Sequence, residues 1–127
     1  MAKQTLQVLK DTFAIHSLDV DESIPTKVLA CDFYFIGKTA DELSLVVPQK
    51  ISIDAQETDY DWRVLEVLGP LSLSMVGIMA EIGNVLAKAK VSIFVVSTFE
   101  TDYFMVKQDT LDKAIEALIK AGYKIEK

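Results

Sequence analysis

The segment from Ser92 to Val106 constrains the fold more than any other part of the chain. Two runs of β-branched and aromatic residues, 92–97 and 103–106, flank a short polar corner. This pattern predicts two antiparallel strands joined by a tight turn. The first run is almost continuously apolar, as expected for a central strand with a covered face. A sheet in this part of the chain therefore needs further elements to cover it.

Two amphipathic segments flank these strands. Apolar residues recur at spacings of three and four over residues 74–89, which predicts a helix that Ser72 or Ser74 caps. A second helix is expected after an N-cap at Asp109, with Gly122 just past its end. With strands at 62–68, 91–97, 103–107 and 123–125, the order is βαββαβ. The prediction is an α+β, ferredoxin-like unit with both helices on one face of an antiparallel sheet.

The first half is predicted to hold similar strands and little helix. Strands are expected at 6–15, with a bend at 10–12, and at 28–36 and 43–47, with a turn at 37–41. A short helix over 26–30 is the alternative for the start of the second strand. The polar segment 51–61 is predicted to connect the halves. We therefore expect an N-terminal subdomain over 1–61 and a C-terminal domain over 62–127. The similar succession of strands suggests that the first is a degenerate copy of the second.

Charge and composition exclude several functions. The net charge of −6 comes from residues 1–61, with five basic and eleven acidic residues, against eight of each in 62–127. An acidic chain disfavours nucleic acid and anionic membrane as partners. The glycines form no phosphate-binding loop, and one His and one Cys make zinc improbable. With no signal peptide or membrane span, we expect a cytoplasmic protein without catalytic residues, metal or cofactor.

The only cysteine and the only histidine are predicted to be structural. Cys31 has no second cysteine with which to form an internal disulfide, and we expect a small buried hydrophobic residue. His16 is expected at the end of a strand, on the surface or with its hydrogen bonds satisfied. Neither residue has a partner in sequence that suggests nucleophilic catalysis.

A small-molecule site is suggested at one end of the predicted sheet. The glycine-bearing helix start around Gly77 offers backbone N–H groups to a carboxylate, and the Ser/Thr/acid corner offers oxygens to an amine. That chemistry fits a zwitterion. Two structural readings compete with it: Gly77 allows close packing of helix on sheet, and the corner is a solvated turn. Met75 and Met79 are expected in the core.

Residues 69–71, 74–80 and 92–103 resemble the ACT domain family. The similarity is to small tandem-ACT proteins like the CASTOR-type sensors and to aspartokinase regulatory regions. The segments 13–15, 41–48 and 62–63 also look like that subgroup. The resemblance implies tandem ACT units and a free amino acid bound at an interface between units. It also implies a homodimer and a regulated protein partner in trans.

The resemblance also assigns the candidate site by position. The loop would hold the main chain of the ligand, the first strand would form a wall, and the corner would supply polar contacts. Because Ser74 stands where many ACT domains have Asp, Glu100 or Asp102 would bind the ammonium group. In the alternative function, a protein interaction module, side chains such as Met75, Phe94 or Phe99 fill the pocket. The candidate residues are Ser74, Met75, Val76, Gly77 and Ile78 in the loop, Phe94, Val95 and Val96 in the strand, and Ser97, Thr98, Phe99, Glu100 and Asp102 in the corner.

Overall fold

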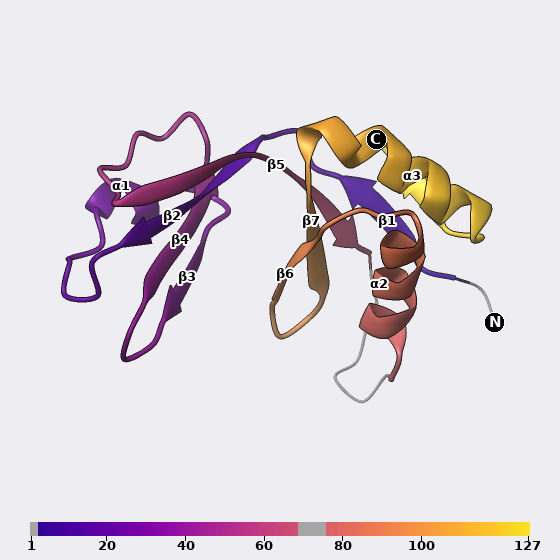
Figure 1. Ribbon diagram of the computed structural model, residues 1–127, viewed down its shortest axis with the longest axis horizontal. Coiled ribbons are helices and arrows are strands. Elements are labelled where there is room, and N and C mark those ends of the chain that lie inside the picture. The colour runs from indigo at the N-terminus through magenta and orange to yellow at the C-terminus, as the bar shows by residue number, and fades with distance from the viewer. Residues whose placement is uncertain (1–2, 69–75) are drawn as a thin grey trace. The chain divides into compact units, whose positions relative to one another are not determined.

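The computed structural model describes residues 3–68 and 76–127, which form two compact units (Figure 1). The C-terminal unit comprises the chain up to Lys10 together with the chain from Arg63 onward. The N-terminal unit comprises residues 11–62. The long strand β5 (Glu57–Val67) contributes its first part to the N-terminal unit and its last part to the C-terminal unit.

Within the described residues, the C-terminal unit is a sheet of order β6-β7-β5-β1-β8, with two helices against one face. From β5 onward the elements follow the order βαββαβ, which confirms the predicted α+β, ferredoxin-like class. The elements besides β5 are β1 (Thr5–Val8), α2 (Ile78–Lys88), β6 (Phe94–Ser97), β7 (Asp102–Lys107), α3 (Leu111–Lys120) and β8 (Lys124–Glu126).

Strand β1 lies inside this sheet, between β5 and β8. It pairs antiparallel with β5, where Leu6 lies opposite Val67, and parallel with β8, where Leu6 lies opposite Ile125. Leu6 is fully buried and Val8 is almost fully buried. Burial of each such side chain stabilises the fold by about 1.5–3 kcal/mol. A segment from the start of the chain thus completes the C-terminal unit.

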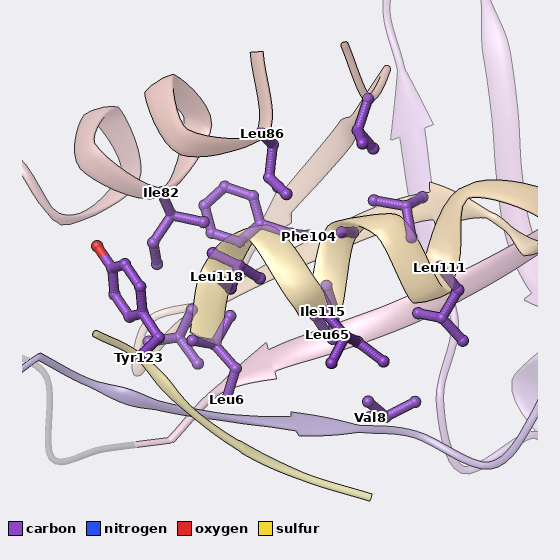
Figure 2. Close-up of a cluster of buried hydrophobic side chains, with 14 residues drawn as sticks. Leu6, Val8, Leu65, Ile82, Leu86, Phe104, Leu111, Ile115, Leu118 and Tyr123 are labelled. Atoms are coloured by element: carbon purple, nitrogen blue, oxygen red, sulfur yellow. The ribbon is translucent and has the colours of Figure 1, made fainter. Parts of the chain in front are cut away.

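The core of the C-terminal unit lies between the sheet and the helices (Figure 2). Alternate residues of each strand face the helices, as the two-residue period of a strand requires. The helices contribute residues at spacings of three and four, which confirms the predicted amphipathic pattern. The labelled core residues are Leu6, Val8, Leu65, Ile82, Leu86, Phe104, Leu111, Ile115, Leu118 and Tyr123.

Both helices end in the same hydrogen-bonded turn. After α3, Gly122 has φ +100°, its N–H donates to Ile119 O (3.0 Å), and the N–H of Tyr123 donates to Leu118 O (3.0 Å). This is a Schellman motif, and Gly122 is the residue predicted for it. After α2 the same two bonds form, but the left-handed residue is Lys90, with φ +62°. Lysine rarely adopts this conformation because its Cβ crowds the backbone.

Asp109 is not the N-cap of α3. It lies in a 3₁₀ turn, η1 (Gln108–Thr110), and the N-cap position is Thr110, with no side-chain capping bond. The Thr110 hydroxyl instead donates to the carbonyl of Lys107 at 3.0 Å. In the sequence, this turn between β7 and α3 is visible only as a short run of polar residues.

The N-terminal unit is a sheet of order β3-β4-β2-β5 with one short helix in its described residues. Its core gathers Leu18, Val28, Leu43, Leu45 and Val47, all with at most 4% exposure. The short helix is the alternative predicted for this region, and the unit is poor in helix as expected. Its further elements are β2 (Phe13–Leu18), α1 (Thr26–Leu29), β3 (Phe35–Lys38) and β4 (Leu43–Pro48).

Several predicted boundaries differ from the structure. The strand expected over 6–15 is two strands, β1 and β2, and they belong to different units. The segment 57–61, expected in a connector, starts β5, and Gly37 lies in β3 instead of in a turn. Residues 3–10 belong with the C-terminal unit, whereas the expected N-terminal subdomain includes them. The division into domains at residue 61 stays a prediction.

His16 and Cys31 both lie in the N-terminal unit. The His16 side chain is only 3% exposed, and its Nδ1 shares a hydrogen bond of 2.8 Å with the Thr58 hydroxyl. Its Nε2 is buried and has no hydrogen-bond partner within residues 3–68 and 76–127. His16 is therefore neither on the surface nor fully satisfied. Cys31 is half-buried, with its thiol 3.5 Å from the carbonyl of Lys27, so the predicted full burial is wrong.

Candidate functional site

The β6–β7 corner is a tight turn held by its own hydroxyl groups. Ser97 and Asp102 lie opposite each other, and Ser97 Oγ donates to Asp102 Oδ1 at 2.7 Å. The N–H of Thr98 donates to Thr101 O (2.9 Å), and the N–H of Thr101 donates to Thr98 Oγ1 (3.2 Å). Phe99, at the tip, is 81% exposed. The corner thus holds a carboxylate and a hydroxyl in fixed positions beside an exposed ring.

A side-chain bond anchors the corner to the sheet. The Thr101 hydroxyl donates to the carbonyl of Val67, the last residue of β5. The chain leaves β5 at this end and continues toward α2. Figure 1 shows the β6–β7 corner and the start of α2 at the same end of the C-terminal unit. The two described parts of the predicted site thus lie at the same end of this unit, and their use as one site stays a prediction.

The start of α2 has no side-chain cap among the described residues. The N-cap is Gly77, with φ +81° and no side-chain capping bond, and the first helical bond runs from the N–H of Glu81 to Gly77 O at 2.8 Å. The N–H groups of the first helical turn have no acceptor within the helix. A Cβ built on Gly77 would meet no atom within 4 Å. Gly77 is thus needed for its left-handed backbone and not for close packing against the sheet.

The predicted start of the helix was too early. The sequence pattern predicts a start at Ser74, whereas α2 begins at Ile78, with Gly77 before its first turn. Ser74 and Met75 lie outside the described residues. Met79 is 41% exposed, so its predicted core position is wrong. Val76 is 92% exposed. Val76, Met79 and Phe99 are thus all exposed apolar side chains.

The β6 residues do not form one wall. Val95 packs against the core beneath the helices, so Phe94 and Val96, its neighbours in the strand, lie on the opposite face of the sheet. All three are half-buried. Phe99 is too exposed to fill a pocket within its own unit, contrary to one form of the interaction-module alternative.

Tyr103 is a residue that sequence reasoning did not include. It lies opposite Val96 across the β6–β7 pair, so the two side chains share the face of that strand pair that is turned away from the helices. Burial first, and then the charges of Glu66 and Glu100, raise the pKa of its hydroxyl. Because an ordinary phenol is already protonated near neutral pH, this rise does not change the charge of Tyr103 there. The alternation of side chains along the strand after the corner is the sequence signal that could have identified Tyr103.

The described residues hold no group of three or more His, Cys, Asp or Glu that could bind a metal ion. None of the described helices combines the length and the apolar composition that a membrane crossing requires. The arrangement that remains is an open helix N-terminus, a fixed Ser–Asp pair and exposed apolar side chains. It suits recognition of a small molecule with both a negative and a positive group.

Comparison with known families identifies this architecture. A model of the ACT domain matches residues 57–120, which is half of the chain and contains α2, β6, β7 and α3. The chain belongs to the ACT domain family. A second family model, which describes an N-terminal domain, matches residues 11–53 of this ACT protein. The predicted resemblance is thus confirmed.

The relatives of this ACT protein include a sensor. The Homo sapiens protein named cytosolic arginine sensor for mTORC1 subunit 1 is 38% identical over 58 residues, 45% of this chain. The match spans only 18% of the sensor's length. A crystal structure of an Agobacterium tumefaciens protein has a TM-score of 0.89 at 30% identity and covers 98% of this chain and 93% of that chain.

Regulatory subunits share the fold. The ligand-free regulatory subunit of aspartate kinase from Thermus thermophilus has a TM-score of 0.68 at 14% identity. The superposition covers 94% of this chain and 99% of that subunit. At this identity the likeness shows the fold alone. The chain thus has the ACT fold of regulatory proteins and is related in sequence to a named amino-acid sensor.

Proposed function

We propose that this ACT protein is a non-catalytic regulator that binds a free amino acid at the end of the C-terminal unit described above. The observation that supports this best is the start of α2 at Gly77, which no described side chain caps, at the same end as the Ser97–Asp102 pair. Backbone N–H groups of the first helical turn bind the carboxylate of the ligand. Asp102 and Glu100 attract its ammonium group or a cationic side chain.

In this proposal the ligand lies at an interface between ACT units, within the chain or across a homodimer. Its binding favours one arrangement of the units, which a protein partner in the cytoplasm recognises. A ligand shifts such an equilibrium only by its difference in affinity for the two states. Arginine is the first ligand to test, because one relative is named an arginine sensor and the corner is acidic.

A second function is favoured by one observation. Val76 and Phe99, with 92% and 81% exposure, form apolar surface that suits contact with another protein. In that case the corner and the start of α2 are a docking surface, and the site binds no amino acid. The two functions differ in one expectation: only the first predicts that a free amino acid alone binds to the protein and raises its stability.

The test is calorimetric titration of the full chain with arginine, then lysine, threonine and leucine. Binding of one amino acid is expected, and a ligand present at about 100 times its Kd raises the free energy of unfolding by about 2.7 kcal/mol. No heat and no shift in melting temperature with any of the twenty amino acids would refute the proposal and favour the docking function.

Substitutions at Gly77 locate the site. Valine there fits the left-handed conformation poorly, so lost binding in Gly77→Val could reflect strain. Gly77→Asn avoids this, because asparagine tolerates that region and still fills the open space. We expect affinity to fall at least tenfold in Gly77→Asn. The matched control is Gly83→Ala in the same helix, whose Cβ makes only an ordinary contact of 3.9 Å with Ile93. Equal affinities in both variants would place the site elsewhere.

A further inference from the structure

The strand β3 lies at the edge of the N-terminal sheet and, among the described residues, has a strand partner on one side only. It pairs with β4, where Ile36 lies opposite Leu45 and Lys38 lies opposite Leu43. The proposed amino-acid site lies in the C-terminal unit and does not involve β3. The edge of a sheet presents backbone donors and acceptors to which a strand from another protein can add.

The register of β3 determines which of its backbone groups face outward. In the turn between β3 and β4, the N–H of Thr39 donates to Glu42 O at 3.0 Å, so these two residues form a hydrogen-bonded pair. Hydrogen-bonded and non-hydrogen-bonded pairs alternate along antiparallel strands. Ile36 and Lys38 are therefore at non-hydrogen-bonded positions, and their N–H and C=O groups point away from β4. These groups are available to a further strand.

The side chains of β3 also leave room for a further strand. Ile36 lies opposite the core residue Leu45, so it faces the same side as that core, yet it is 38% exposed. A neighbouring strand would cover it, and burial of an aliphatic side chain is favourable. Gly37 has no positive φ, and a Cβ there would make only an ordinary contact of 3.9 Å with Ser44. The described part of this unit does not require glycine there, whereas close approach of a second backbone favours it.

The charge of the N-terminal unit selects the kind of partner. Residues 11–62 contain eleven acidic and three basic residues, a net charge of −8. Exposed acids flank β3 in the sequence, with Asp32 before it and Asp41 and Glu42 after it. The one basic residue of the strand, Lys38, donates from its Nζ to the carbonyl of Thr39 at 2.9 Å. A basic segment is therefore attracted to this edge, whereas a second copy of the chain would bring another unit of charge −8 close to it.

We propose that β3 is the docking site for a protein partner that adds a basic, extended segment to the sheet. The segment pairs with the backbone of Ile36 and Lys38, places an apolar side chain beside Ile36, and carries lysine or arginine toward the flanking acids. This proposal goes beyond the proposed function, because it gives the surface and the chemistry of a partner and requires no bound amino acid. Since exposed charges contribute to the contact, binding is expected to weaken with salt.

The test uses a synthetic peptide of about eight residues in which lysine alternates with valine, to match the two-residue period of a strand. The isotope-labelled full chain is titrated with this peptide and followed by NMR. Amide exchange with solvent is expected to slow at Ile36 and Lys38, whose N–H groups face outward, and to change little at Gly37, which bonds to β4. A peptide with glutamate in place of lysine is expected not to bind. Raising the salt from about 0.05 M to about 0.5 M is expected to weaken binding of the lysine peptide.

Two substitutions of Lys38 separate backbone pairing from charge. Lys38→Pro removes an outward N–H without removing a bond to β4, so the fold is expected to persist and peptide binding to weaken at least about tenfold. The matched control, Lys38→Ala, removes the same side chain and keeps the N–H. It is expected to bind at least as tightly as wild type, because it removes a positive charge. Circular dichroism checks that each variant folds.

A third variant keeps the strand backbone unchanged. Ile36→Lys removes the apolar contact and places a positive charge in the middle of the edge, where lysine is common in natural edge strands. It is expected to weaken binding of the lysine peptide, so the proposal is testable even if Lys38→Pro does not fold.

Four results would overturn the proposal. They are no binding at about 1 mM lysine peptide, equal affinity of Lys38→Pro and Lys38→Ala, equal binding of the glutamate peptide, and resonances of β3 that shift with protein concentration when no peptide is present. The last result would assign the edge to a second copy of the chain. All titrations are made without free amino acid, so their failure leaves the proposed function standing, and a failed amino-acid titration leaves this proposal standing.

Discussion

The buried His16 predicts a loss of stability in mild acid. In the unfolded chain its imidazole has a pKa near 6.5, and burial lowers that pKa in the folded protein. Below about pH 6.5, the unfolded state therefore binds a proton that the folded state does not. The free energy of unfolding falls as the pH falls through this window, until the folded pKa is reached. Above pH 6.5 both states are neutral, and the effect is absent.

The size of the effect follows from one proton. The slope reaches at most about 1.4 kcal/mol per pH unit, so the loss between pH 7.5 and pH 5.5 is at most about 1.4 kcal/mol. The geometry gives the reason: the side chain is 3% exposed, and no described residue offers its Nε2 an acceptor for the added proton. The hydrogen bond between Nδ1 and the Thr58 hydroxyl satisfies only one of the two ring nitrogens.

The assay uses the single tryptophan. Trp62 is 8% exposed and belongs to the same unit as His16, so its fluorescence reports unfolding of that unit in urea. Wild type and His16→Leu are compared at pH 7.5 and pH 5.5, and the difference between them removes the effect of other groups. Parallel pH dependence in the two proteins would refute the reasoning. A His16 proton titration by NMR with a midpoint at or above 6.5 would refute it as well.

Three further changes in the C-terminal unit have predicted signs, and urea unfolding checks each. Lys90→Gly is expected to stabilise by about 0.5–1 kcal/mol, because it removes a side chain from a residue with φ +62°. Gly122→Ala is expected to cost about 1 kcal/mol, since its φ is +100°; a neutral result would contradict the turn geometry. Tyr123→Phe is expected to be neutral or to stabilise by up to about 1 kcal/mol, because the hydroxyl is buried and no described residue bonds to it. A loss above that size would mean that the hydroxyl is bonded.

Periodic patterns predicted the C-terminal elements well. Apolar spacing located α2 and α3, and strand runs located β6 and β7. The predicted ends of helices are wrong where the backbone conformation of a single residue decides them. Nothing in the residue types shows that Gly77 ends the segment before α2, since a glycine with positive φ looks the same as one inside a helix. The left-handed Lys90 carries no local signal either, because lysine is normally a good helix former.

The candidate site was only partly predictable. Hydroxyl and acidic residues at a strand end predicted the corner, and Ser97 and Asp102 do bond there. The wall of three β6 residues was wrong in form, because alternation sends Val95 to the core and its neighbours to the other face. The Thr101 bond to Val67 O joins residues 34 positions apart, which no local pattern reveals.

The position of β1 differs most from the sequence prediction, and the difference has a physical explanation. A strand of four residues has too short an alternation to specify its partner, so Leu6 and Val8 fit any sheet with a covered face. Their continuity with Phe13 and Ile15 suggested a single strand in the N-terminal half. The polar residues 10–12 are instead the passage from one unit to the other. Pairing with β5 and β8, and not local sequence, decides where β1 lies.

We therefore expect that the segment matched by the ACT model is not a complete folding unit. Residues 57–120 include neither β1 nor β8, and a fragment from residue 57 to the end still lacks the strand between β5 and β8. Such a fragment loses the burial of Leu6 and Val8, about 3–6 kcal/mol together, and exposes two strand edges. Against a typical domain stability of about 5–15 kcal/mol, we expect it not to unfold cooperatively.

Adding β1 back tests whether pairing is the cause. A peptide of residues 3–10 supplied to the fragment is expected to restore a cooperative urea transition in circular dichroism. The same peptide with Leu6→Asp, which places a charge at a fully buried position, is expected to fail. If the fragment alone unfolds cooperatively, with the stability of the full chain, β1 is not needed for folding of the sheet. In that case a boundary near residue 61 would be a true domain boundary.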